Sequence, residues 1–228
     1  MAFYSYKVFF IRRKIMKKTF AIVALLVMVV SVVSAGSVYL DSGVSLLSGS
    51  RTLKNEGSSD GEKLKFANTY IPLEIGYRET FDNGVVVSGS AGVFFNLKET
   101  VEGETSDEKM FPSVFSFKAQ AGYGMKINEK LAAEFLGGLS YSFGSKSEEG
   151  TGFKSKRSQS TIILVGEAGI KYEIADSITL RAGAKIGIPF ASSIKATYTS
   201  GSHSTTNKFK FSGFMFNFTP FVGAAYQF

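Results

Sequence analysis

From residue 36 onward, hydrophobic and polar residues alternate with a period of two along eight stretches of the chain. Ile178, Leu180 and Ala182 begin one such run, each separated from the next by a residue of the other kind. Each run covers about 10 to 14 residues, which is longer than an ordinary strand and suits one that crosses a bilayer at a tilt. The pattern predicts an all-β chain of eight strands.

The breaks between the runs alternate in length. Short breaks lie near residues 81–84, 126–129 and 175–177. Longer breaks lie near residues 49–65, 98–110, 144–158 and 192–208. Short turns at one end and long loops at the other are typical of barrels in outer membranes. The expected fold is therefore an eight-stranded antiparallel up-and-down transmembrane β-barrel, with short periplasmic turns, four longer extracellular loops and both termini in the periplasm.

Alternation alone does not say which face of the sheet lines the barrel. A soluble lipocalin-like barrel keeps its apolar face inside, whereas a membrane barrel turns that face toward lipid. The polar faces are rich in Gly and Ser, as at Ser88, Ser90 and Gly92, and carry few charges. A water-facing exterior would be about a quarter charged or more. We therefore expect the apolar residues to meet lipid and the small and charged residues to line a narrow lumen.

Nine charged residues fall on the predicted lumen face, and their signs nearly balance. They are Asp41, Glu74, Arg78, Lys118, Glu134, Glu167, Lys171, Arg181 and Lys185. If the last short turn is centred on Asp176, Glu167 faces Lys185, and Lys171 faces Arg181. A buried charge without a partner costs several kcal/mol. We predict a connected ion-pair network that closes the barrel centre; the alternative is a wet lumen with separately solvated charges.

Four tyrosines lie near a short turn or the chain end, on every second predicted strand: Tyr77, Tyr123, Tyr172 and Tyr226. An amphipathic ring prefers the level of the lipid headgroups, so this placement predicts an aromatic girdle on the periplasmic side. The alternative interpretation is the ordinary preference of Tyr for strands.

The first 35 residues have a different character. The formal net charge of the chain is +7, and six basic residues with no acid precede residue 19. Lys17 and Lys18 are followed by an apolar run over residues 20–33 and a small-residue site ending at Ala35. The run is shorter than the roughly 20 residues of a spanning helix. We expect an extension plus a cleavable signal peptide over residues 1–35, with translation starting at Met16, and a barrel over residues 36–228; the alternative is a retained anchor.

The last predicted strand reads FMFNFTPFVGAAYQF, with Val222, Ala224, Tyr226 and the terminal Phe228 on one face. It resembles the terminal strand of bacterial outer-membrane barrels, which the barrel-insertion machinery reads. With the leader and the strand count, the chain resembles the small eight-stranded barrels of the OmpX/Ail type and the OmpA transmembrane domain. The resemblance implies the outer membrane of a diderm bacterium, with outer-membrane lipid and the insertion machinery as partners.

Candidate chemistry is sparse. The chain has no Cys and one His, His203, in a polar segment that we expect to be a mobile loop. A catalytic base must be held on rigid backbone, so we expect no enzyme, no cofactor and no metal site. The densest basic run, Lys154, Lys156 and Arg157, is a candidate anion-binding loop for lipopolysaccharide or host surface molecules, or simply a solvated loop. Charge beyond the leader is nearly balanced, which argues against nucleic acid.

These observations favour a non-enzymatic outer-membrane barrel that is structural or binds surface molecules through mobile loops, in the manner of an adhesin. One alternative is a small-solute channel of the porin type. Another is a soluble periplasmic carrier of the lipocalin type.

Overall fold

The computed structural model describes residues 36–55, 61–106, 108–201 and 203–228. The expected signal peptide lies outside these residues. No helix within these ranges is long and apolar enough to cross a membrane. The strands are β1 (Gly36–Gly43), β2 (Ser45–Asn55), β3 (Gly61–Thr80), β4 (Val85–Val101), β5 (Glu104–Ser106), β6 (Ser113–Lys126), β7 (Leu131–Gly150), β8 (Phe153–Ala175), β9 (Ile178–Ser200), β10 (His203–Ser212) and β11 (Met215–Gln227).

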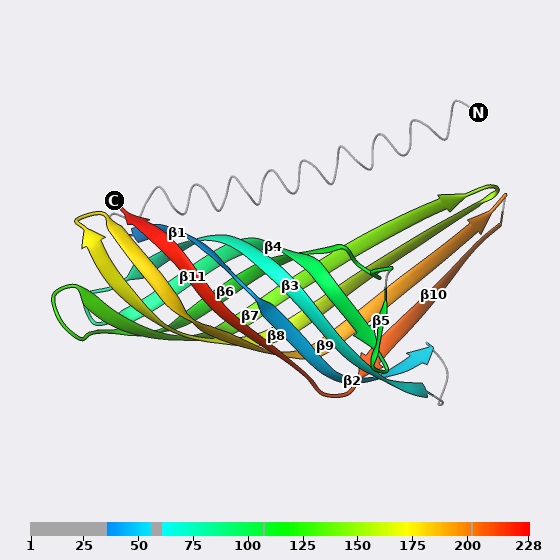
Figure 1. Cartoon of the computed structure of the whole chain (residues 1–228), viewed down its shortest axis with the longest axis horizontal. Coiled ribbons are helices and arrows are strands. Elements are labelled where there is room, and N and C mark those ends of the chain that lie inside the picture. Colours follow the sequence, from blue (N-terminus) through cyan, green and yellow to red (C-terminus); the bar gives the residue numbers. More distant parts are fainter. Residues whose placement is uncertain (1–35, 56–60, 107, 202) are drawn as a thin grey trace, which may run out of the picture.

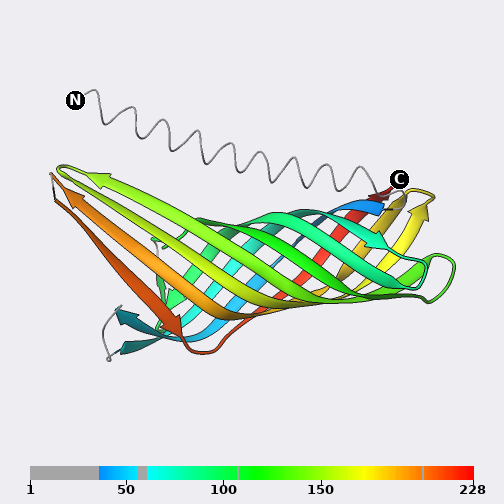
Figure 2. The same cartoon turned by 180° about the vertical axis from the view of Figure 1, so that it is seen from behind.

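The strand segments form a closed antiparallel ring (Figures 1 and 2). β1 and β2 are one wall strand interrupted at Val44, and β10 and β11 are another, interrupted at Gly213 and Phe214. β1 pairs with β11 from Ser37↔Gln227 to Gly43↔Phe221, which closes the ring. β5 only extends the edge of β4. The described part of the chain is thus the eight-stranded up-and-down barrel that the hydrophobic alternation predicts.

The two faces of the sheet have opposite chemistry. Leu164 on β8 is 53% exposed on the outer wall, whereas Glu167, three residues further along the same strand, is 6% exposed in the lumen. Leu139, Leu180 and Val222 are likewise exposed on neighbouring strands. The outer wall is therefore apolar and suited to lipid. This is the arrangement of a membrane barrel, not of a lipocalin-like one.

The barrel has two distinct ends, which we call the turn end and the hairpin end. At the turn end, short connections join β3 to β4, β6 to β7 and β8 to β9, and both described termini lie there (Figure 1). At the hairpin end, β7, β8, β9 and β10 continue well past the ring (Figure 1).

Three of the expected loops contain paired strands in the structure. Residues 49–54 pair with residues 61–66, and two further segments form long β-hairpins. Residues 144–158 and 192–208 stay paired almost to the tips, with turns at Gly152 (φ 81°) and Gly201 (φ 57°). His203 is not in an irregular loop but pairs with Ser200. The apolar alternation of the lipid face stops there because the outward-facing residues become mostly polar, although the strand pairing continues. Hydrophobic periodicity therefore predicts strand ends too early.

Backbone pairing is interrupted along one line of the wall. The ladder between β9 and β11 ends at Gly187↔Asn217, and the ladder between β9 and β10 resumes at Ser192↔Phe211. Residues 188–191 and 212–216, all described, have no ladder partners across this line. Pro189, which has no backbone N–H to donate, lies in this stretch.

Candidate functional site

All nine predicted lumen charges lie inside the barrel and belong to one connected network. Glu167 is at its centre. Its carboxylate oxygens lie 2.8 Å from Arg78 Nη2, 3.0 Å from Arg181 Nη2 and 3.5 Å from Lys118 Nζ. The Glu167 side chain is 1% exposed, so these three cations replace its hydration almost completely.

Two further carboxylates extend the network toward the hairpin end. Lys185 Nζ lies 3.0 Å from both Asp41 Oδ2 and Glu74 Oε1. Arg181 Nη1 lies 2.8 Å from Asp41 Oδ1, and Lys118 Nζ lies 2.8 Å from Glu74 Oε1. Each of these cations therefore has two carboxylate partners.

At the turn end, Glu134 completes the network. It forms ion pairs with Arg78 and with Lys171 Nζ, the latter at 2.6 Å. Lys171 is the most exposed of the nine side chains, at 24%. The register of β8 and β9 places Glu167 opposite Lys185 and Lys171 opposite Arg181. The like-charged second pair separates, because Arg181 turns to Asp41 and Glu167 while Lys171 turns to Glu134.

Tyr39 lies at the centre of the lumen, and the sequence analysis did not single it out. It is 1% exposed, with the Arg181 guanidinium 4.3 Å and the Arg78 guanidinium 5.0 Å from its ring centre. Its hydroxyl donates to Glu74 Oε1 at 3.3 Å. Cations over an aromatic face are attracted by its quadrupole. The available signal was its place in the sequence. Tyr39 is two residues from Asp41 and therefore shares the lumen-facing parity of the strand.

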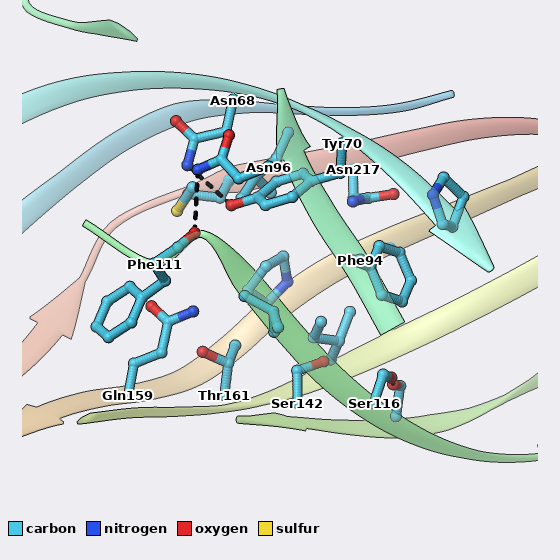
Figure 3. Close-up of a pocket in the computed structure, with 18 of the residues that line it drawn as sticks. Asn68, Tyr70, Phe94, Asn96, Phe111, Ser116, Ser142, Gln159, Thr161 and Asn217 are labelled. Atoms are coloured by element: carbon cyan, nitrogen blue, oxygen red, sulfur yellow. Dashed lines mark hydrogen bonds between the residues drawn. The ribbon is translucent and has the colours of Figure 1, made fainter. Parts of the chain in front are cut away.

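A cavity of about 360 Å³ lies on the hairpin side of this network. Asp41, Glu74, Lys118 and Lys185 border it on the turn side, while Arg157 and Tyr198 line it toward the hairpin end. Its wall contains a cluster of apolar side chains (Figure 3). The cluster consists of Tyr70, Phe111, Val114 and Ile194, with Leu47, Phe94, Met110 and Phe209 packed against it.

This cavity was not expected from the alternation of apolar and polar residues. Its apolar residues occupy positions of the polar parity, beside outward-facing apolar neighbours, as in the pairs Phe94–Phe95 and Val114–Phe115. Such doubled apolar positions near the hairpin end were the available signal. They break the simple rule of apolar outside and polar inside.

Primary amides provide much of the polar lining of the cavity. They are Asn68, Asn96, Gln120, Gln159 and Asn217. Three of them are held by the protein through their nitrogens. Asn96 donates to the Phe111 carbonyl at 3.3 Å and Asn68 to the Tyr70 hydroxyl at 2.9 Å (Figure 3). Asn217 donates to the Ser45 hydroxyl at 2.9 Å.

The connection between β4 and β6 folds into the mouth of the cavity. Glu99 accepts a hydrogen bond from the Met110 amide at 3.0 Å, and Lys146 Nζ lies 2.8 Å from Glu108 and 2.7 Å from Glu148. Hydrogen bonds to Glu108 and Glu148 raise the pKa of Lys146, and the bond from Lys146 lowers the pKa of Glu148. These contacts hold Phe111 over the cavity, where it is 4% exposed.

The basic run does not form a single site. Lys154 and Lys156 are exposed, and Lys154 pairs with Glu149, whereas Arg157 lines the cavity. Because successive strand residues point to opposite faces, neighbours in the sequence separate in space. Within the described residues, no group of three His, Cys, Asp or Glu side chains could hold a metal ion.

The predicted tyrosines and the C-terminal residues lie on the outer wall at the turn end. Tyr123, Tyr172 and Tyr226 are exposed, and Tyr77 is half-buried, with its ring centre 6.3 Å from that of Phe228. Val222, Ala224 and Phe228 are exposed on the same face as Tyr226. The structure therefore gives the last strand an apolar outer edge.

A closed eight-stranded ring with an apolar wall and a charged lumen defines a small transmembrane β-barrel of the outer-membrane type. Comparison with solved structures gives the same class. The chain is similar to OprG of Pseudomonas aeruginosa, with 16% identity, 86% of this chain and 97% of that chain covered, and a TM-score of 0.51. It is also similar to Neisserial surface protein A, with 15% identity, 86% and 100% coverage and a TM-score of 0.47.

A further similar structure is Ail of Yersinia pestis, at 17% identity, 85% and 99% coverage and a TM-score of 0.37. Comparison of the sequence with family models and with curated proteins gives no match. At 16% identity, the likeness to OprG shows the fold alone, and this fold agrees with the resemblance of the C-terminal strand.

Proposed function

We propose that this protein is a non-enzymatic outer-membrane barrel that binds a small, largely apolar molecule in its lumen. The observation that carries the proposal is the cavity of about 360 Å³ between the ion-pair network and the hairpin end. Its volume lies at the small end of the range of about 300–1,000 Å³ for ligand sites. Aromatic and aliphatic side chains form much of its wall, which favours an apolar occupant.

We place the hairpin end outside the cell and the turn end, with both termini, in the periplasm. Short turns on the periplasmic side and longer extracellular connections support this orientation. The exposed tyrosines at the turn end fit the inner headgroup level. The signal peptide ending at Ala35 and recognition of Val222, Ala224, Tyr226 and Phe228 by the insertion machinery complete this proposed route to the membrane.

The network argues against the small-solute channel. Its nine charged side chains fill the lumen on the turn side of the cavity, and the central Glu167 and Arg78 side chains are 1% and 2% exposed. A solute entering from the hairpin end would meet paired charges that are costly to separate. We therefore propose a binding cavity with a closed floor.

A second candidate is binding of lipopolysaccharide or a host surface molecule by the hairpins. The observation in its favour is their length, since β7 to β10 carry ordered strands past the ring (Figure 2). Exposed cations such as Lys156 and Lys195 lie on this extension. Three or four surface charges steer weakly at physiological salt, so the cavity supports the better-defined function.

The test combines ligand binding with conductance. Purified protein in lipid nanodiscs is titrated with ethylbenzene and followed by backbone amide chemical shifts. We expect saturable shifts at Val114 and Ile194, and loss of binding in Val114→Phe, which fills the cavity. Phe115→Leu, on the lipid side of the same strand, is the matched control and retains binding. Steady channels of porin size in planar bilayers, or equal ethylbenzene affinity in both variants, would contradict the proposal.

A further inference from the structure

Gln120 is a buried amide whose hydrogen-bonding groups are unused. It lies on β6 two residues from Lys118, lines the cavity and is 5% exposed. Neither its Nε2 nor its Oε1 forms a hydrogen bond with any described residue. A buried donor or acceptor left without a partner has lost its hydration without compensation, so native structures seldom retain one.

The residues that flank Gln120 explain why the protein leaves it unpaired. Its neighbours on the adjoining strands are Ser88 on β4 and Gly138 on β7. The Ser88 hydroxyl lies 3.2 Å from both the Tyr77 carbonyl and the Tyr39 hydroxyl, and is engaged there. Gly138 offers no side chain. The amide of Gln120 therefore remains available to an occupant of the cavity.

The charges at the floor of the cavity, on the same side as Gln120, are already paired with one another. Lys118 and Lys185 pair with Glu74, and Lys185 also pairs with Asp41. The network has one more base than acid, but its most exposed base, Lys171, pairs with Glu134 and is not among the cavity-lining residues. At this floor an ionic head group would have to compete with existing ion pairs, whereas a neutral polar group would not.

We infer that Gln120 binds the polar end of the molecule that fills the cavity. The molecule is an uncharged, mostly apolar compound whose polar end both donates and accepts a hydrogen bond, such as an alcohol or a carboxamide. A primary amide matches such a group, because it presents an acceptor oxygen and a donor nitrogen side by side. The apolar body lies against Tyr70, Phe111 and Val114. This inference rests on the proposed function.

The experiment compares two ligands that differ by one hydroxyl group, 2-phenylethanol and ethylbenzene. Both are titrated into wild-type protein, Gln120→Leu, Gln159→Leu and Gln227→Leu in nanodiscs. Gln120→Leu keeps the approximate size and removes the amide. We expect it to weaken 2-phenylethanol about tenfold and to change ethylbenzene affinity less than twofold. Gln159→Leu removes another amide of the cavity wall and tests the opposite orientation of the ligand. Gln227→Leu, at the turn end and outside the cavity lining, is the matched control, with less than twofold effect on either ligand.

The outcomes separate this inference from the proposed function. If neither ligand binds the wild type, the proposed function fails, and the inference fails with it. If both bind and Gln120→Leu weakens them equally or not at all, the cavity function stands and the role of Gln120 is wrong. A loss of 2-phenylethanol binding in Gln159→Leu alone would mean that the hydroxyl group of the ligand binds Gln159, and it would overturn the inference. Nuclear Overhauser contacts between the Gln120 amide protons and 2-phenylethanol test the wild type directly, and their absence at saturation would also overturn the inference.

Discussion

Replacing Glu167 with Gln tests the ion-pair network directly. The substitution keeps the shape of the side chain and removes the negative charge that lies 2.8, 3.0 and 3.5 Å from Arg78, Arg181 and Lys118. The lumen would then hold five bases and three acids. Breaking a buried ion pair costs about 3–5 kcal/mol. Each of the three cations keeps another carboxylate partner, in Glu134, Asp41 or Glu74. We therefore expect Glu167→Gln to lower the free energy of unfolding by about 3 kcal/mol, at the low end of that range.

The measurement is urea-induced unfolding of the protein in lipid vesicles, followed by circular dichroism and by the mobility of unheated samples in gels. Lys171→Met is the control, because Lys171 is partly exposed and its partner Glu134 retains Arg78. We expect it to cost about 1 kcal/mol or less. Removing Arg78 together with Glu167 should cost less than the sum of the single changes, because the two interact. Equal losses for Glu167→Gln and Lys171→Met would refute a network centred on Glu167.

Two further predictions concern the wall and the cavity mouth. Leu164→Arg, at mid-strand on the lipid face, should cost about 2–4 kcal/mol of folding into bilayers, whereas Lys154→Ala on a hairpin should cost little; equal effects in the same titration would contradict the assigned faces. The folded-state pKa of Glu148 is lowered by Lys146, so this contact persists at neutral pH and is lost as pH falls through that lowered value. The pKa of Lys146 is raised, so its contribution persists until pH rises above the ordinary lysine range. Order parameters of the Met110 amide should therefore be constant around neutral pH and fall only when the pH drops below the ordinary range of glutamate, while those of Leu139 should not change.

The architecture of the ring could be predicted from the sequence because lipid imposes a strict rule on the outer wall. Residues such as Leu164 and Val222 must be apolar at every second position, and this period is visible without coordinates. Charges at the other parity must find partners inside a narrow lumen, so Glu167 and Arg181 could be assigned to the interior from the same pattern.

The cavity and the hairpins could not be predicted in this way. Phe94 and Val114 face inward although they are apolar, because the lumen on the hairpin side of the network has its own apolar core. Gln120 is available because its cross-strand neighbours are Gly138 and Ser88, and Ser88 is engaged elsewhere. These neighbours are known only once the strand register is known. In the hairpins beyond residue 144 the outward-facing residues are mostly polar, so the apolar period of the lipid face no longer marks the strands.

The closing contact of the ring has a consequence for biogenesis. β1, in blue, lies beside β11, in red (Figure 1), and Asp41 on β1 supplies a carboxylate to Arg181 and Lys185 on β9. A half-assembled sheet would carry these cations into hydrocarbon without that neutralising partner, at a cost that increases with depth. Entry into the bilayer and joining of the first strand to the last therefore belong to a single cooperative event, and a stable partly inserted intermediate is not expected.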